Sequence, residues 1–207
     1  MKTYLSIAAF AGILFLSVAG NGIAADPATP PSTAIIDQAV IAKVREWVDS
    51  NVVHLTLAER NRVNASLDQA KIDALDKQWR EERKVADQPL ITAVLSSPLS
   101  GYLTRIQARS LGLYSEIFVI DAKGLNAGQS SITSDYWQGD EAKWQKTFLV
   151  GPEAVFIDEP EYNKETGTWR AQLNMTLAQD QKPVGSVTVE INLTELERRR
   201  ALNLAQN

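Results

Sequence analysis

Residues 116–148 read EIFVIDAKGLNAGQSSITSDYWQGDEAKWQKTF, and this stretch decides the fold. It opens with the apolar, largely β-branched run Ile117–Ile120, which favours a short strand. Asp121–Gly124 then supplies the Asp and Gly that a tight turn needs, and residues 125–130 can return as a second strand. The stretch therefore predicts an antiparallel hairpin that leads into a polar Ser/Thr segment.

Behind the Ser/Thr segment, aromatic and acidic side chains are concentrated in a few positions. The candidate ligand-binding residues are Asp135, Tyr136, Trp137, Asp140 and Trp144. Aromatic rings attract cations through their faces, and carboxylates accept charge-assisted hydrogen bonds from amines and hydroxyls. A pocket built from these residues suits a small cationic or hydroxylated ligand.

Some of these residues also have a packing interpretation. Trp144 and Phe148 lie four positions apart, the spacing of one face of a short helix, and Asp135 can cap such a helix. The sequence leaves both interpretations open for Trp144, whereas packing is favoured for Phe148.

The order of strand, D-x-x-G turn, strand, Ser-rich segment, Asp-Tyr and short helix resembles the extracytoplasmic Cache sensor domains, also called PDC or PAS-like sensors. Asp121 and Gly124 match the family's turn, and Asp135 and Tyr136 match one wall of its small-molecule pocket. Residues 183–191, PVGSVTVEI, are similar to the family's last hairpin and strand. The resemblance therefore covers roughly residues 116–193.

One departure from the family concerns the ligand. Many amino-acid-binding members carry an Arg three residues after the Tyr, where it holds the ligand carboxylate. Gly139 stands at that position here, and Asp140 and Glu141 follow it. The resemblance implies the fold and a pocket, but not an anionic ligand.

The N-terminus predicts export. Residues 1–25 combine a basic start, an apolar run without charges and a small-residue end, which are typical of a secretory signal peptide cleaved after Ala24 or Ala25. No later apolar run is long enough to span a membrane, so the expected product is a soluble periplasmic protein.

The mature chain is expected to be one Cache-like sensor domain, residues 34–207, behind a flexible proline-rich lead, residues 26–33. Apolar periodicity predicts long helices over residues 34–111, with helix starts at Thr56, Pro89 and Pro98. The Thr56 start rests on a capping-box pattern, and one long bent helix through this region remains an alternative.

The second part of the domain, residues 112–193, is expected to form a PAS-like antiparallel sheet of about five strands. Residues 153–158 read as a buried strand, and residues 158–167 as a polar turn region. Residues 168–177 alternate apolar and polar side chains, which predicts one core face and one solvated face. A C-terminal helix capped by Thr194 completes the expected α+β fold.

Composition restricts the chemistry. The chain has no cysteine, a single histidine, His54, and a formal net charge of -4. Thiol catalysis, thiolate or multi-histidine metal sites and a Ser-His-Asp triad are therefore not expected, and His54 is interpreted as a packing residue. We expect no catalytic residue, metal or cofactor, and no nucleic-acid partner.

A calcium site would need a suitable acidic motif. Asp135, Asp140, Asp158 and Glu159 are candidate ligands for such a site. They lack the Asp-x-Asp-x-Asp-Gly spacing of a calcium loop, so this alternative is disfavoured.

The favoured function is a periplasmic Cache-type protein that binds a small molecule and presents the bound state to a membrane receptor or kinase, or sequesters the ligand. A structural or dimerising envelope protein is the alternative. The resemblance also implies dimer contact through the N-terminal helices, for which the faces that carry Trp47 and Trp79 are the candidates. A hydrolase is less favoured. It would require a carboxyl group with a raised pKa within reach of a nucleophile.

Overall fold

The computed structural model of the chain describes residues 29–202. The predicted signal peptide, the first residues of the proline-rich lead and residues 203–207 lie outside this range. Within residues 29–202, each helix is too short or too polar to span a bilayer.

The first part of the described chain is helical, as predicted. Its elements are the short 3-10 helix η1 (Thr33–Ile35) and the α-helices α1 (Gln38–Val48), α2 (Asn51–Asn64), α3 (Gln69–Glu82), α4 (Pro89–Leu95) and α5 (Pro98–Arg109). The predicted starts of α4 and α5 are confirmed, because each begins with a proline whose missing N–H would have no partner in a first turn. Ser97 also caps α5 by accepting a hydrogen bond from the Ser100 N–H.

The helix start predicted at Thr56 is wrong. α2 already begins at Asn51, so Thr56 lies inside it, and Val53 and Leu57 form its buried face. The chain breaks instead after Asn64, and Asp68 caps α3 by accepting a hydrogen bond from the Lys71 N–H at 3.0 Å. The T-x-x-E pattern at Thr56 is therefore part of a helix interior.

The second part forms an antiparallel sheet of six strands, which confirms the predicted α+β class. The strands are β1 (Tyr114–Asp121), β2 (Asn126–Gln129), β3 (Val155–Ile157), β4 (Glu161–Asn163), β5 (Thr168–Gln179) and β6 (Lys182–Asn192), in the order β2-β1-β6-β5-β3 with β4 also paired to β5. The extra strand, β4, lies in the segment predicted as a polar turn. A short helix, α6 (Ala142–Gln145), stands between β2 and β3.

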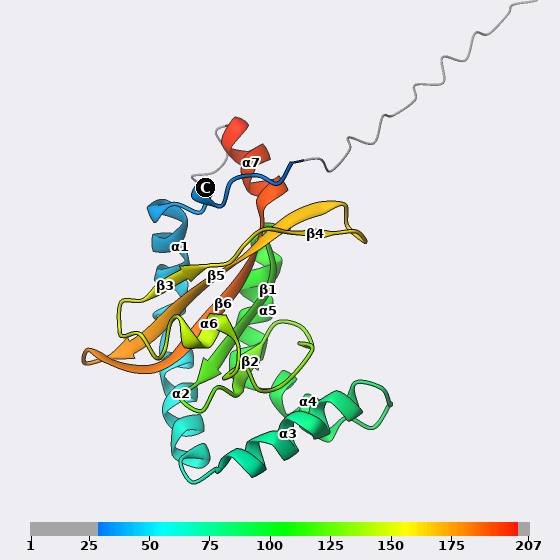
Figure 1. Cartoon of the computed structure of the whole chain (residues 1–207), viewed down its shortest axis with the longest axis vertical. Coiled ribbons are helices and arrows are strands. Elements are labelled where there is room, and N and C mark those ends of the chain that lie inside the picture. The colour runs from blue at the N-terminus through cyan, green and yellow to red at the C-terminus, as the bar shows by residue number, and fades with distance from the viewer. Residues whose placement is uncertain (1–28, 203–207) are drawn as a thin grey trace, which may run out of the picture.

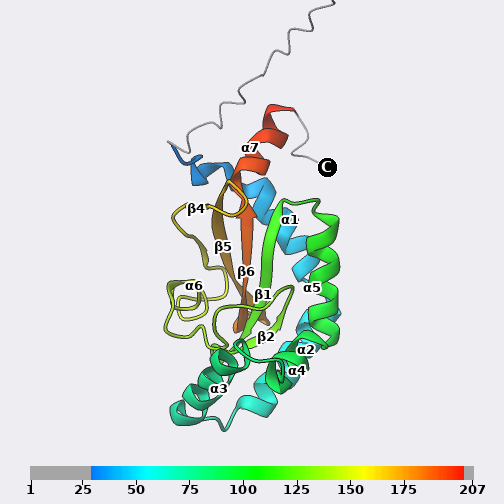
Figure 2. The same cartoon turned by 90° about the vertical axis from the view of Figure 1, so that its right-hand side faces the viewer.

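The two faces of the sheet have different covers (Figures 1 and 2). Helices α1, α2 and α5 lie along one face and bury the apolar residues of β1, β5 and β6, such as Ile117, Leu173 and Val189. The predicted apolar alternation along β5 is confirmed, since Ala171, Leu173 and Met175 all belong to this core.

The opposite face is not solvated as predicted. Asn174 and Thr176 on β5, and Ser186 and Thr188 on β6, are all buried there. The segment between β2 and β3, including α6, folds back over this face (Figure 2), and the Trp144 indole N–H donates to the Asp121 carbonyl at 3.3 Å. Alternation in one strand predicts two faces, but it cannot reveal what a distant segment covers.

Strand β3 also differs from the prediction of a buried strand. It is an edge strand that pairs only with β5 among the described strands, and Val155 is 36% exposed. An edge strand has sheet on one side only, so its apolar residues are less completely covered.

The last helix, α7 (Leu193–Ala201), is capped by Asn192 rather than by Thr194. The Asn192 side chain accepts from the Glu195 N–H at 3.0 Å, whereas the Thr194 hydroxyl accepts from the Trp169 N–H. Arg200 then donates to Asp37 at 2.6 Å. This contact ties α7 to the start of α1, at the end of the sheet where both described termini lie (Figure 1).

Gly124 supports a stability prediction. It has a φ of +82°, and a Cβ there would lie 2.8 Å from the Gly139 backbone, whereas Gly112 has a φ of +85° with nothing within 4 Å of such a Cβ. Both Gly→Ala substitutions incur a left-handed backbone penalty of about 1–2 kcal/mol. Gly124→Ala should lose about 1–3 kcal/mol more because of overpacking, measured by urea unfolding. Equal losses would show that this close backbone approach is not a constraint.

Candidate functional site

Asp121 anchors the predicted D-x-x-G turn. It is fully buried, and one carboxylate oxygen accepts from the Lys123 and Leu125 N–H groups at 2.8 and 3.0 Å. The other oxygen accepts from the Asn64 side-chain amide at 2.6 Å, which fixes the end of α2 against the turn. Burial raises the pKa of Asp121 even with these hydrogen bonds.

Tyr136 lies in a small aromatic core rather than on an open wall. It is 1% exposed, and its ring stacks on Trp79 with centroids 5.2 Å apart. Arg60 donates a hydrogen bond to the Tyr136 hydroxyl, and the Tyr136 N–H donates to Asp76 at 2.9 Å. The segment at Tyr136 is thus held from both α2 and α3.

The two tryptophans proposed as dimer contacts differ in their surroundings. Trp79 is fully buried inside this chain, so the face of α3 that carries it is an internal surface. Trp47 is half-buried and packs against Tyr114 with ring centroids 6.0 Å apart. Of the two faces, only that of Trp47 remains partly open.

The Trp137 indole explains why the family's arginine position carries glycine here. Its N–H donates to the Lys123 carbonyl at 3.0 Å, which lays the ring across Gly124 and Gly139. A Cβ at Gly139 would lie 2.5 Å from the indole nitrogen. An arginine at this position is therefore incompatible with the observed place of Trp137.

The remaining candidate residues, Asp135, Asp140 and Trp144, differ in burial and in their contacts. Asp135 accepts from the Gln138 side chain at 2.8 Å and lies 3.5 Å from Arg80, whereas Asp140 is exposed. Trp144 stacks on Phe148 with ring centroids 4.9 Å apart. None of the five candidates lines either of the two cavities described below, and their contact with a ligand stays a prediction.

Four buried polar residues on the covered sheet face escaped sequence reasoning. We call Asn174, Thr176, Ser186 and Thr188 the polar quartet. Asn174 lies opposite Thr188, and Thr176 opposite Ser186. The Thr188 hydroxyl donates to Asn174 at 2.8 Å, but the buried hydroxyls of Thr176 and Ser186 have no partner among the described residues.

The sequence signal for the quartet was present but ambiguous. β5 places Arg170, Gln172, Asn174 and Thr176 at every second position, a pattern that normally marks a solvated face. In the structure this face is covered by residues 139–151, here called the cover segment, so the hydroxyls are buried rather than solvated.

A cavity of about 250 Å³ opens on the same face of the sheet as the quartet, at the β4 end of β5, and none of the quartet residues lines it. Its lining residues come from the cover segment, the β3–β4 connection and strands β4, β5 and β6, and they are mostly charged. Arg170 pairs with Glu190 at 2.9 Å, and Lys143 pairs with Glu141 at 2.6 Å. We call this space the acidic cavity.

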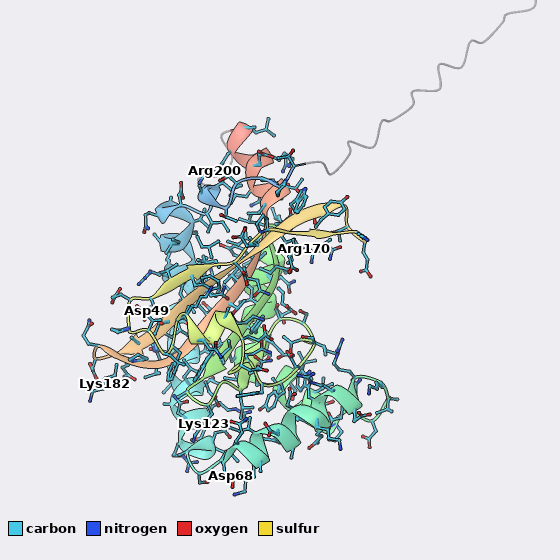
Figure 3. The ribbon with its side chains drawn as sticks, viewed as in Figure 1. Asp49, Asp68, Lys123, Arg170, Lys182 and Arg200 are labelled. Atoms are coloured by element: carbon cyan, nitrogen blue, oxygen red, sulfur yellow. The ribbon has the colours of Figure 1, made fainter. Side chains whose placement is uncertain are left out.

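A larger cavity of about 410 Å³ lies at the break between α1 and α2. His54 lines it and contacts Asp49 at 2.6 Å, beside Met175 and Leu177 of β5. Asp49 and Arg170, one residue from each cavity, lie toward opposite ends of β5 in Figure 3. His54 is therefore partly buried, and it also lines this cavity.

Glu116 is a mostly buried acid of β1 that the sequence did not single out. Its carboxylate accepts a hydrogen bond from the Ser131 hydroxyl at 2.7 Å. Burial raises the pKa of Glu116 above its ordinary value of 4.5, and the neighbouring Glu190 adds to this rise. Within residues 29–202, no group of three or more His, Cys, Asp or Glu side chains is arranged to hold a metal ion.

Comparisons with known proteins give structural likenesses only. No protein-family model and no curated protein matches the sequence. The fold is similar to the ligand-binding domain of a Campylobacter jejuni chemoreceptor solved with 4-methylisoleucine, with 14% identity, 74% of this chain and 65% of that chain covered, and a TM-score of 0.37.

Two further solved structures are similar. One is the ligand-binding domain of the Pseudomonas aeruginosa amino-acid chemoreceptor PctC with GABA (13% identity, 70% and 60% covered, TM-score 0.36). The other is the extracellular domain of a protein described as a histidine kinase (16% identity, 78% and 64% covered, TM-score 0.41). This chain thus spans less than two thirds of each of these three domains.

The hydroxyl of Tyr136 supports a stability prediction. Tyr136→Phe leaves the partly buried Arg60 guanidinium without this acceptor, so the free energy of unfolding should fall by about 1–3 kcal/mol in urea titrations. Tyr162→Phe is the control, because no hydrogen bond of the Tyr162 hydroxyl is found within the described chain. Equal stability of Tyr136→Phe and wild type would contradict the anchoring role.

Glu116 supports a prediction of pH dependence. Because its folded pKa lies above the unfolded value, the folded state binds more protons, and stability from this group falls as pH rises from about 4.5 through the folded pKa. Glu116→Gln should remove this part of the decline and be at least as stable as wild type at pH 7.5. Urea unfolding at several pH values, with Glu165→Gln as an exposed control, measures the difference. Parallel curves for Glu116→Gln and wild type would contradict it.

Proposed function

We propose that this chain is an extracytoplasmic small-molecule-binding protein of Cache type, which holds its ligand between the covered sheet face and the cover segment. The observation that carries the proposal is the polar quartet. Two of its buried hydroxyls have no partner among the described residues, and the acidic cavity opens on the same face of the sheet. Sheet positions under a cover normally carry apolar side chains, so polar ones there favour a binding surface.

The energetics of these hydroxyls support a ligand or ordered water as their partner. A buried polar group without a hydrogen bond destabilises the fold by about 1–3 kcal/mol. A ligand hydroxyl or amine that reaches Thr176 and Ser186 would recover part of this free energy. The small-molecule class expected from the sequence, cationic or hydroxylated, matches this requirement.

Export and signalling form the wider part of the proposal. Residues 1–25 direct the chain to the periplasm, where the ligand-bound state is presented to a membrane receptor or kinase, or the ligand is sequestered. The candidate wall residues Asp135 and Asp140 would contribute acidic groups near the ligand. A homodimer, if formed, would use the partly open Trp47 face of α1.

The hydrolase alternative meets only one of its requirements. Glu116 has a raised pKa and contacts the Ser131 hydroxyl. In the described chain no further side chain hydrogen-bonds to Glu116 to orient it as a triad would. Binding rather than catalysis is therefore proposed.

A thermal-shift screen tests this function. The full chain is mixed with amino acids, polyamines, quaternary amines, carboxylates, sugars and divalent cations, and a ligand selective for the folded state raises Tm by mass action. Thr176→Val should weaken binding of the hit about fivefold or more without lowering the Tm of the free protein, because it removes only a hydroxyl that has no partner.

Thr92→Val, an exposed position on α4, is the matched control and should bind as wild type does. A folded protein that responds to no ligand class would contradict the proposal and favour a structural envelope protein. Unchanged affinity in both Thr176→Val and Ser186→Ala would show that the ligand binds elsewhere.

A further inference from the structure

Two glutamates face each other across the covered side of the sheet. Glu116 of β1 and Glu190 of β6 are register partners on neighbouring strands, so their side chains emerge on the same face. Like charges directly opposite each other destabilise a sheet. Glu190 lines the acidic cavity, and Glu116 lies beside Glu190 on the neighbouring strand without being one of the lining residues.

The protein neutralises only one of the two carboxylates by direct contact. Glu190 pairs with Arg170 at 2.9 Å. Glu116 accepts only the Ser131 hydroxyl, and no Lys or Arg nitrogen lies within 4.0 Å of it in residues 29–202. Glu116 is therefore a mostly buried acid whose counter-charge is missing from its direct contacts.

The nearest cation of the cover segment is already engaged. The Lys143 ammonium pairs with Glu141 at 2.6 Å and lies 5.6 Å from the centroid of the Phe118 ring. Arg170 is likewise held by Glu190. Both cations of the acidic cavity are thus matched one to one by carboxylates.

The remaining charges of the cavity are negative. Its lining contains the carboxylates of Glu141, Asp158, Glu159, Glu161 and Glu190 and only the cations Lys143 and Arg170. A cavity with this excess of negative charge raises the local concentration of cations at its mouth. An anionic ligand would meet repulsion at the mouth and find no free guanidinium inside.

We propose that the acidic cavity takes a small organic cation, an amine or guanidinium, whose charged nitrogen is held by the carboxylates of Glu116 and Glu190. This inference rests on the proposed function and names the ligand class of the same site. A volume of about 250 Å³ corresponds to about eight waters at about 30 Å³ each, so a short aliphatic diamine fits.

Four ligands with four-carbon chains but different charges separate the effect of ligand charge from the effect of ligand size. Isothermal titration of the full chain with putrescine, GABA, succinate and 1,4-butanediol compares a dication, a zwitterion, a dianion and a neutral diol on similar frames. Putrescine should bind most tightly, and its affinity should fall as salt concentration rises. Tighter binding of GABA, succinate or the diol, or no binding of putrescine, would overturn the inference.

Two charge-removing variants test the residues. Glu116→Gln and Glu190→Gln should each weaken putrescine binding at least tenfold, whereas Asp87→Asn, at an exposed site on the α3–α4 connection, should leave it unchanged. Glu190→Gln also frees Arg170, so this variant should bind succinate better than wild type does. Circular dichroism confirms that each variant is folded.

The outcomes separate the two proposals. If putrescine affinity survives in both glutamine variants, or the preferred ligand is not cationic, this inference fails while a ligand-binding function stands. If the folded protein binds neither this series nor any class in the thermal-shift screen, both fail.

Discussion

The arrangement of the whole molecule depends on the antiparallel pairing of β1, β6 and β5, because that pairing gives the sheet two chemically different faces. In this register, Val119, Val187 and Met175 point to the helices, while Phe118, Thr188 and Asn174 point to the cover segment. A slip of one residue would exchange the two sets. The helices α1, α2 and α5 then supply the apolar cover that the first set requires, and the second set lies under the cover segment.

The cover segment is held over this face of the sheet mainly by polar anchors rather than by a large apolar core of its own. Asp121 binds the turn before it and the end of α2, and Asp76 binds the backbone at Tyr136 and Trp137. These carboxylates satisfy backbone N–H groups that a buried loop would otherwise leave without partners. α2 and α3 thereby hold the chain just before the segment, and the Trp144 indole N–H, which donates to the Asp121 carbonyl, holds α6 in place.

Packing and charge differ between the turn and the acidic cavity. The Trp137 indole occupies the space that a side chain at residue 139 would need. The acids of the β3–β4 connection and Glu190 give the acidic cavity its negative charge. The glycine at residue 139 thus has a physical cause in the position of the Trp137 ring, and the negative charge of the cavity comes from other residues.

Local sequence alone determined the features that depend on neighbours along the chain. Proline starts of α4 and α5, the Asp121–Gly124 turn and the apolar face of β5 follow from fixed φ angles, turn chemistry and period-two alternation. The helix starts expected from Thr56 and Thr194 differ from the observed ones, because α2 already begins after Ser50 and Asn192 rather than Thr194 caps α7. The tertiary structure alone decided that Tyr136 stacks inside the core on Trp79, that the polar face of the sheet is buried, and that Glu116 meets Glu190 across two strands. Residues 116 and 190 are far apart in sequence, and no local pattern specifies which strands become neighbours or which loop closes over them.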